Sequence, residues 1–228
     1  MREIVLDTET TGLDPLAGHR VVEVGCIELL NTVATGKSFH AYFNPEMLMP
    51  MGAQDIHGLS DEFLADKPLF AERLDELLAF LGDAQLVIHN AQFDIGFLNA
   101  ELERLGRPQL ANAYVDTVSV ARRKFPGQRV SLDALCERFN VDNSARTKHG
   151  ALLDAELLAE VYLELSGGRQ RDLGLAPEMA AASVVANLGM TNRPVRPSRP
   201  HAPTASELAA HMAFLQQLTN PLWLQAAV

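Results

Sequence analysis

The chain has only two cysteines among 228 residues, and they form no Cys-x-x-Cys pair. Cys26 and Cys136 lie in apolar periodic segments, which is typical of reduced core residues rather than of a disulfide or a zinc site. No apolar run approaches the roughly 18 residues of a membrane span. Charged residues at Arg2, Glu3 and Asp7 interrupt the start, where a signal peptide needs an apolar stretch. We therefore expect a soluble, cytoplasmic protein with no membrane partner.

Positive charge is also scarce, because 19 Lys and Arg face 29 Asp and Glu, for a formal net charge of -10. Broad, non-specific binding of nucleic acid normally depends on an excess of cationic side chains that neutralise phosphates. A nucleic-acid substrate must then be held at a few points, through metal or a local patch. The apolar content of 47% is enough for the full core of one α/β domain, with sequence left over.

The order of the expected elements predicts a mixed sheet flanked by helices. Three strand-like segments follow one another with short connections, which favours an antiparallel meander. Helical and short strand-like segments then alternate, as in parallel α/β structure. Residues 45–66 are expected to be irregular, with Ser60 as a helix cap. The expected strands are 4–7, 21–30, 37–43, 86–88 and 114–117, and the expected helices are 68–81, 94–105, 118–124, 131–139 and 149–165.

The composition changes after Gly168, where the last helix of the domain should end. Residues 193–203 are rich in proline and poor in apolar anchors, which indicates an extended linker. Thr204 and Glu207 then form a capping-box pattern at the start of a short amphipathic helix of about 15 residues. We expect a domain over 1–168, a flexible linker over 169–203, and a docking segment over 204–228.

Two carboxylates follow the first apolar strand directly. Asp7 and Glu9 stand at i and i+2, and side chains with that spacing project from the same face of a strand. Two like charges at this distance are unfavourable in a half-buried site unless a cation lies between them. The pair therefore favours a divalent metal site. The alternative is a frayed strand end with two solvated acids.

Three further residues stand at the ends of expected elements. Asp94 follows a short apolar strand at the entry to a helix, and Asp154 stands five residues after His149 near the start of another. Acids at such positions often serve only the helix dipole, and a lone histidine is more often solvated than catalytic. Each of the three is weak evidence by itself.

Taken together, these residues match a known pattern. The segments 7–12, 89–94 and 149–154 resemble, in order and spacing, the three motifs of the DEDDh 3′ to 5′ exonucleases. The resemblance extends over residues 1–168 and is greatest to the proofreading exonucleases of bacterial replicative DNA polymerases. It includes the stretches 87–90, 131–136 and 146–155. All five family positions are present, which argues against a catalytically dead homologue.

The resemblance implies a ribonuclease H-like fold with a five-stranded mixed sheet, and a site for two divalent ions, Mg²⁺ or Mn²⁺. His149 would be the general base, with an intrinsic pKa of about 6.5 that suits proton transfer at cellular pH. His57 matches a family position near the terminal nucleotide. The implied metal ligands are Asp7, Glu9, Asp94 and Asp154. The implied substrate contacts are Thr8, Glu9, Thr10, Thr11, Gly12, Leu13, His57 and Asp154.

The sequence of the tail leads to two further hypotheses about binding partners. Residues 170–175 resemble the short peptides that bind the bacterial sliding clamp, with Gln170, Leu173 and Leu175 as anchors. The alternative is that these residues are only the beginning of the linker and bind no partner. The terminal segment aligns apolar residues that the resemblance assigns to docking on the polymerase (alpha) subunit. The alternative there is packing against the chain's own domain. The expected docking residues are Leu208, Met212, Leu215, Leu218 and Trp223.

The favoured function is removal of mispaired 3′-terminal nucleotides from DNA with a single-stranded or frayed 3′ end. An RNA-trimming exonuclease of the same superfamily, such as an oligoribonuclease, is a second hypothesis. Such enzymes are not expected to carry a long linker with a terminal helix. A third hypothesis makes the protein chiefly an assembly adaptor, but an intact set of metal ligands has no purpose in a pure adaptor.

Overall fold

The computed structural model describes residues 1–144, 146, 148–168 and 202–218. Residues 1–168 and residues 202–218 belong to separate units whose relative placement is not determined. In these ranges no helix combines the length and the apolar character that crossing a bilayer requires.

Residues 1–168 are built on the predicted five-stranded mixed sheet, and its strand order is β3-β2-β1-β4-β5. The antiparallel meander is confirmed, because β1 pairs with β2 and β2 with β3 in that sense. The two later strands are parallel, β4 to β1 and β5 to β4. The strands are β1 (Arg2–Thr10), β2 (Val21–Leu30), β3 (Val33–Tyr42), β4 (Gln85–Ile88) and β5 (Tyr114–Asp116).

The third strand begins earlier than the expected residue 37. Asn31 and Thr32 adopt φ values of 53° and 69°, and a pair of positive φ angles is what a two-residue hairpin turn requires. Leu30 therefore pairs directly with Val33. Residues 33–36, which precede the expected strand, therefore belong to β3.

Seven α-helices and one 3₁₀ helix are present in the described part of residues 1–168. The expected irregular structure over 45–66 is wrong in part, since this stretch contains α1 and α2. Both helices are shorter than the window in which an apolar period can be recognised. Gly58 ends α1 with a φ of 80°, and the Ser60 hydroxyl caps α2 by accepting from the Phe63 amide. The helices are η1 (Pro15–Ala17), α1 (Met51–His57), α2 (Asp61–Leu64), α3 (Phe70–Leu81), α4 (Ala91–Arg104), α5 (Thr117–Lys124), α6 (Leu132–Phe139) and α7 (Ala151–Leu165).

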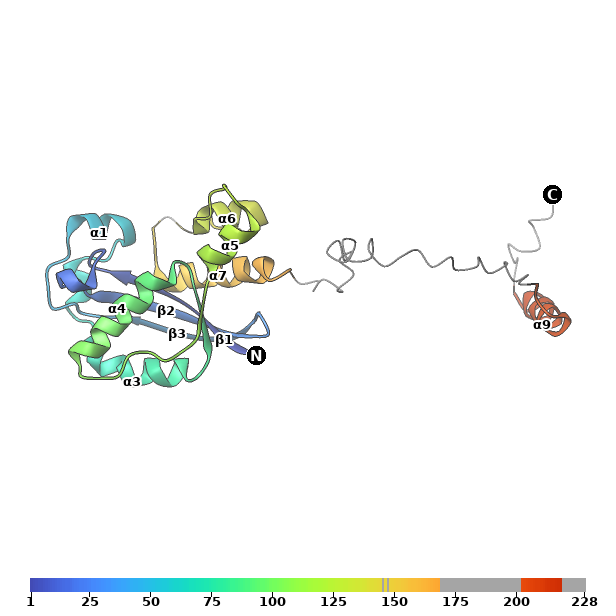
Figure 1. The fold of residues 1–228 in the computed structure, drawn as a ribbon, viewed down its shortest axis with the longest axis horizontal. Coiled ribbons are helices and arrows are strands. Elements are labelled where there is room, and N and C mark those ends of the chain that lie inside the picture. The colour runs from blue at the N-terminus through green and yellow to red at the C-terminus, as the bar shows by residue number, and fades with distance from the viewer. Residues whose placement is uncertain (145, 147, 169–201, 219–228) are drawn as a thin grey trace, which may run out of the picture. The chain divides into compact units, whose positions relative to one another are not determined.

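The sheet is the middle of three layers (Figure 1). Alternate side chains of β1 enter different cores: Ile4 and Leu6 join a cluster with residues of α3 and α4, whereas Val5 joins one with residues of α5, α6 and α7. Asp7 and Glu9 have the parity of Val5, so they point to the α7 side of the sheet. The two-residue period of the strand thus directs both acids toward the helix that carries Asp154.

The helix α9 (Ala205–Leu215) occupies the described part of the tail. The capping box is confirmed: the Thr204 hydroxyl accepts from the Glu207 amide at 3.3 Å, and the Glu207 carboxylate accepts from the Thr204 amide at 2.7 Å. The helix is somewhat shorter than expected. The clamp anchors Gln170, Leu173 and Leu175, the docking residue Trp223 and most of the linker lie outside the described residues.

Candidate active site

The four predicted metal ligands and His149 come together around one cleft of about 300 Å³. Asp7 and Glu9 come from β1, and Asp94 and Asp154 lie in the first turns of α4 and α7. Asn90 caps α4 with a φ of 72°, a left-handed conformation that Asn tolerates better than most residues. The carboxyl ends of adjacent strands and two helix N-termini thus meet at this cleft.

A glycine on β2 allows α7 to approach the sheet this closely. Gly25 is the cross-strand partner of Asp7. A Cβ atom added to Gly25 would lie 2.3 Å from the backbone of Ala151 and Leu152 at the start of α7. Only a residue without a side chain fits, because such a separation is far below van der Waals distance. Sequence reasoning missed this role, because it depends on the proximity of two distant segments.

The carboxylates are poorly stabilised by the protein alone. Burial, and then repulsion by Asp94, Glu9 and Asp154, raise the pKa of Asp7 well above its ordinary value. Burial and the charge of Asp154 raise the pKa of Glu9 to about 8. Burial raises the pKa of Asp94 to about 7, although the Thr8 hydroxyl, which donates to Asp94 at 2.7 Å, opposes the shift.

This donor set fits divalent metal ions. Hard oxygen ligands crowded in a buried site are what Mg²⁺ and Mn²⁺ prefer, and a cation removes the repulsion that raises these pKa values. One ligand atom each from Glu9, His149 and Asp154 lies within 4.8 Å of the other two. Asp7 and Asp94 line the same cleft, so the arrangement has room for metal between the strand and the helices.

Asp154 differs from the other acids because it has a permanent cationic partner. Arg146 donates from Nε to Oδ1 and from Nη2 to Oδ2, both at 2.6 Å. Burial opposes ionisation of Asp154, but hydrogen bonds from His149 and Arg146 hold its pKa below the ordinary value. The Arg146 side chain is only 8% exposed and also donates to Asp133 at 2.6 Å. Sequence reasoning missed this residue too, because a lone arginine in a loop has no period or spacing that marks it.

His149 lies at the edge of the cleft, with a side chain that is 48% exposed. Its amide donates to the Ile56 carbonyl at 3.2 Å, which connects this loop to α1. Arg146 Nη2 lies 2.8 Å from Nδ1, and Asp154 Oδ2 lies 3.2 Å from the same nitrogen. Nδ1 therefore lies between a cationic donor and a carboxylate acceptor, and the tautomer of His149 decides which of the two it hydrogen-bonds.

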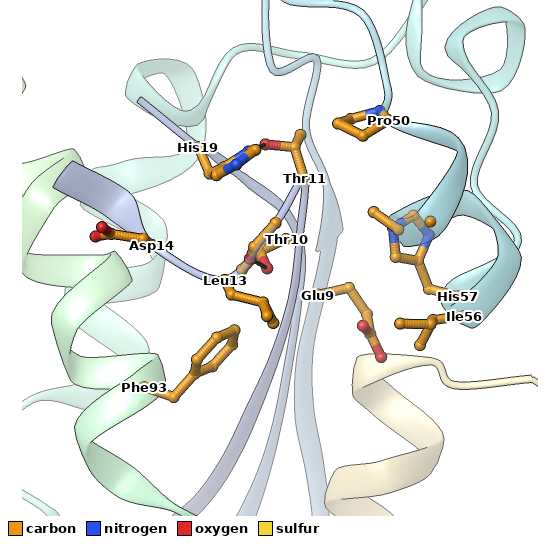
Figure 2. A pocket seen from close by; sticks show the side chains of 13 residues that line it. Glu9, Thr10, Thr11, Leu13, Asp14, His19, Pro50, Ile56, His57 and Phe93 are labelled. Carbon is orange, nitrogen blue, oxygen red and sulfur yellow. Dashed lines mark hydrogen bonds between the residues drawn. The ribbon is translucent and has the colours of Figure 1, made fainter. Parts of the chain in front are cut away.

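A second cavity, of about 620 Å³, shares Glu9 with the catalytic cleft (Figure 2). Six of the predicted substrate residues line it: Glu9, Thr10, Thr11, Gly12, Leu13 and His57. Phe93, His19, Ile56 and Pro50, which the sequence did not single out, line it as well. Apolar walls with a few polar groups are typical of a small-ligand pocket.

The three threonines predicted to contact substrate have different positions and hydrogen-bond partners. The Thr10 hydroxyl donates to the Gly12 carbonyl at 2.6 Å, and the Thr11 hydroxyl lies 3.1 Å from His19 Nδ1. These two contacts shape the turn after β1. Thr8 lines the catalytic cleft rather than the second cavity, and its hydroxyl is used by Asp94.

His57 places an unsatisfied polar atom at the second cavity. Its Nδ1 accepts from the Leu59 amide at 3.0 Å, so the ring proton is on Nε2. Nε2 is buried and has no hydrogen-bond partner among the described residues. Burial lowers the pKa of His57, so the group is a neutral donor. A buried donor without a partner is costly, so this Nε2–H is a candidate hydrogen-bond donor to a ligand in the cavity.

Known proteins share both the sequence and the fold. Residues 4–162 match the exonuclease family RNase_T. The chain is 51% identical to the DNA polymerase III subunit epsilon of Rickettsia felis over 96% of this chain and 97% of that one. It is 45% identical to the DNA polymerase III subunit epsilon of Escherichia coli, covering 94% of this chain and 92% of the relative.

Two solved structures have the same fold at low identity. The nuclease domain of 3'hExo, a DEDDh family member bound to rAMP, aligns with a TM-score of 0.64 at 18% identity, covering 75% of this chain and 94% of that one. Exonuclease X in complex with 5′ overhanging duplex DNA gives 0.57 at 22% identity, with 72% and 90% covered. These alignments confirm the ribonuclease H-like fold.

The chain is therefore a member of the exonuclease family, and the predicted 3′ to 5′ exonuclease class is confirmed. Enzymes of this family depend on divalent metal. Within the family, the chain belongs with the epsilon subunits of DNA polymerase III.

Proposed function

We propose that this protein proofreads DNA synthesis by hydrolysing the terminal phosphodiester at a mispaired 3′ end. The observation that carries the proposal is the cleft in which Asp7, Glu9, Asp94 and Asp154 converge beside His149. An acidic cluster of this kind cannot receive a phosphodiester until cations compensate its charge. Binding of the substrate and hydrolysis should therefore both require metal.

Asp7, Glu9, Asp94 and Asp154 would hold two divalent ions, Mg²⁺ or Mn²⁺. When bound, these ions supply charge stabilisation for the phosphate and the leaving 3′ oxygen. His149, half exposed at the edge of the cleft, takes the proton from the attacking water as general base. Arg146 keeps Asp154 ionised and correctly oriented through its two 2.6 Å hydrogen bonds.

The second cavity receives the terminal nucleotide. Its volume of about 620 Å³ and its position beside Glu9 suit a nucleoside next to the reacting phosphate. Phe93 and the 83% exposed Leu13 offer apolar surface to a base, and His57 Nε2 supplies a hydrogen-bond donor. A base must leave the duplex to enter, which favours single-stranded and frayed ends.

The tail connects the nuclease to its partners. In α9, Leu208 and Met212 are 50% and 49% exposed, whereas Leu215 is 4% exposed; Leu218, which follows the helix, is 39% exposed. An exposed leucine and methionine surface at a chain end suits docking on a polymerase subunit, and the relatives are named as subunits of DNA polymerase III. Gln170, Leu173 and Leu175 remain the proposed anchors for a sliding clamp.

The catalytic proposal is tested by removing one ligand at a time. Asp7→Ala, Asp94→Ala and Asp154→Ala should each lower the rate on single-stranded DNA by several orders of magnitude, because each removes a metal ligand. His149→Ala should lower it by roughly 10²- to 10⁴-fold. Glu103→Ala, which changes an exposed acid on the same helix as Asp94, is the matched control. Wild-type activity in Asp7→Ala would contradict the proposal.

A further inference from the structure

Five cationic side chains gather on α5, on α6 and on the loop between them, although the chain as a whole is strongly acidic. They are Arg122, Arg123, Lys124, Arg129 and Arg138, here termed the basic strip, and all are exposed. Only two carboxylates, Asp133 and Glu137, lie in the segment 117–138. The net charge of -10 is therefore reversed locally.

Most of this positive charge is available to a partner. Among the described residues, Arg122, Arg123 and Lys124 form no ion pair. Arg129 meets Glu137 at 3.9 Å, with both side chains at least 80% exposed, and such a pair in water contributes little. Asp133 is already engaged by Arg146 at 2.6 Å. The acids nearby therefore do not neutralise the strip.

The strip is continuous with a hollow of about 410 Å³. Gln128, Arg129, Ala134, Glu137 and Arg138 line this hollow. The Arg138 guanidinium lies 4.3 Å from the centre of the Phe125 ring, a cation–π contact that fixes its position. Since Phe125 directly follows the cationic end of α5, this contact joins the two halves of the strip.

The strip also borders the catalytic cleft. Ser131, Leu132 and Asp133 line the cleft, whereas their neighbours Gln128, Arg129 and Ala134 line the hollow. One short stretch of chain at the start of α6 therefore faces both. The hollow of the basic strip therefore adjoins the catalytic cleft along this stretch.

We propose that the basic strip binds the phosphate backbone of the DNA strand upstream of the 3′ end that is hydrolysed. This inference rests on the proposed function, because it takes the strand in the cleft to be DNA. The strip provides local electrostatic attraction for DNA phosphates, although the protein as a whole is negatively charged. It contributes affinity without reading sequence, since phosphate contacts carry no base information.

The test compares a short and a long substrate in the full-length protein. For a triple variant Arg123→Gln, Lys124→Gln, Arg129→Gln, kcat/KM is measured on a DNA trinucleotide and on a DNA single strand of about 20 nucleotides. Because the trinucleotide is too short to extend far along the strip, the long-to-short ratio of kcat/KM should fall about tenfold from wild type. The dependence of log kcat/KM on log salt for the long strand should become less steep by about 2, because each phosphate that the variant no longer neutralises accounts for about 0.7.

A matched triple variant, Lys37→Gln, Arg73→Gln, Arg107→Gln, also removes three positive charges but lies on β3, on α3 and after α4. It should keep the wild-type ratio and slope. The single variant Arg129→Gln should change the slope by about 0.7, which provides a test if the triple variant folds poorly. Wild-type ratio and slope in both strip variants would overturn the proposal. If the wild-type protein cleaved neither substrate, the proposed function would fail as well.

Discussion

At the scale of single residues, Arg146 is the side chain on which the geometry of Asp154 depends most. It forms a two-point ion pair with Asp154 and also contacts Asp133 and His149. Lysine cannot reproduce two parallel hydrogen bonds from one planar group. The charge of residue 146 and its shape can therefore be tested separately.

We expect Arg146→Lys to lower kcat by about 10- to 100-fold, the usual effect of removing a group that orients a metal ligand. The concentration of Mg²⁺ that gives half-maximal activity should also rise, because Asp154 loses its fixed orientation. Steady-state kinetics over a series of Mg²⁺ concentrations measures both effects. Asp133→Asn, which weakens the outer contact of Arg146 and leaves its two bonds to Asp154 in place, is the milder control. An unchanged Mg²⁺ dependence in Arg146→Lys would rule out the positioning role.

The raised carboxylate pKa values predict how stability depends on pH. Glu9 and Asp94 titrate with pKa values of about 8 and 7 in the folded protein without metal, against ordinary values of 4.5 and 3.8. Between the ordinary and the raised pKa values the folded state therefore binds more protons than the unfolded state, so the free energy of unfolding falls as the pH rises. Mg²⁺ should reverse this decline, because a cation replaces the protons.

The expected result is that Mg²⁺ raises Tm more at a pH of about 8 than at a pH of about 6, since the carboxylates bind protons in place of metal at the lower pH. Thermal unfolding in chelator and in Mg²⁺ measures this difference. In the variant Glu9→Gln, Asp94→Asn, which cannot ionise at these positions, the decline in stability with pH should be smaller and Mg²⁺ should have little effect. An equal Mg²⁺ effect at both pH values in the wild-type protein would contradict this explanation.

At the scale of elements, the distance between β2 and α7 decides whether the site can form. Gly25→Ala would place a Cβ 2.3 Å from backbone atoms of α7, and backbone cannot move aside as a flexible side chain can. We expect α7 to shift and to move Asp154 away from Asp7, with activity reduced by about 100-fold or more. Overpacking of this kind typically lowers stability by about 1–3 kcal/mol.

Activity and chemical denaturation together check this prediction. Gly96→Ala is the control, because nothing lies within 4 Å of a Cβ added there and its helix α4 tolerates alanine. If Gly25→Ala retained full activity, the close approach of α7 would not be needed to assemble the site.

The sequence predicted those elements and site residues whose signals are local. The i and i+2 spacing placed Asp7 and Glu9 on one face, and leucines at helical spacing identified α3. The helices α1 and α2 were missed because each is too short to show a period. The role of Gly25 depends on a contact between distant segments, and no window of sequence contains it. Arg146 lies only eight residues before Asp154, but no periodic spacing marks a loop arginine as the partner of that carboxylate. The site as a whole was predicted from the resemblance of the three motifs to the exonuclease family. Asp94, Asp154 and His149 would not have identified it individually.

At the scale of the whole molecule, the tail is expected to act as a tether. If α9 docks on the polymerase as proposed, its connection to the domain through residues 169–203 would keep the nuclease near the polymerase at high effective concentration. Deleting residues 204–228 should abolish co-purification with the polymerase subunit but leave activity on single-stranded DNA nearly unchanged. Substituting Leu208 and Met212 by Ala should weaken the interaction in the full-length chain.

Pull-down with purified polymerase subunit, followed by an exonuclease assay on the same samples, measures both properties. Tight binding after the deletion would refute the docking role. Loss of nuclease activity would instead indicate that the segment packs on its own catalytic domain.

The most direct test of the central claim is the degradation of a primer with a single mispaired 3′ nucleotide. The wild-type protein with Mg²⁺ should remove that nucleotide faster than the terminal nucleotide of a fully paired primer, and should act more slowly on a 3′-labelled RNA of the same sequence. The variant Asp7→Ala, Glu9→Ala should be inactive on all three. Equal rates on mispaired and paired primers, or a preference for the RNA, would contradict the proofreading function.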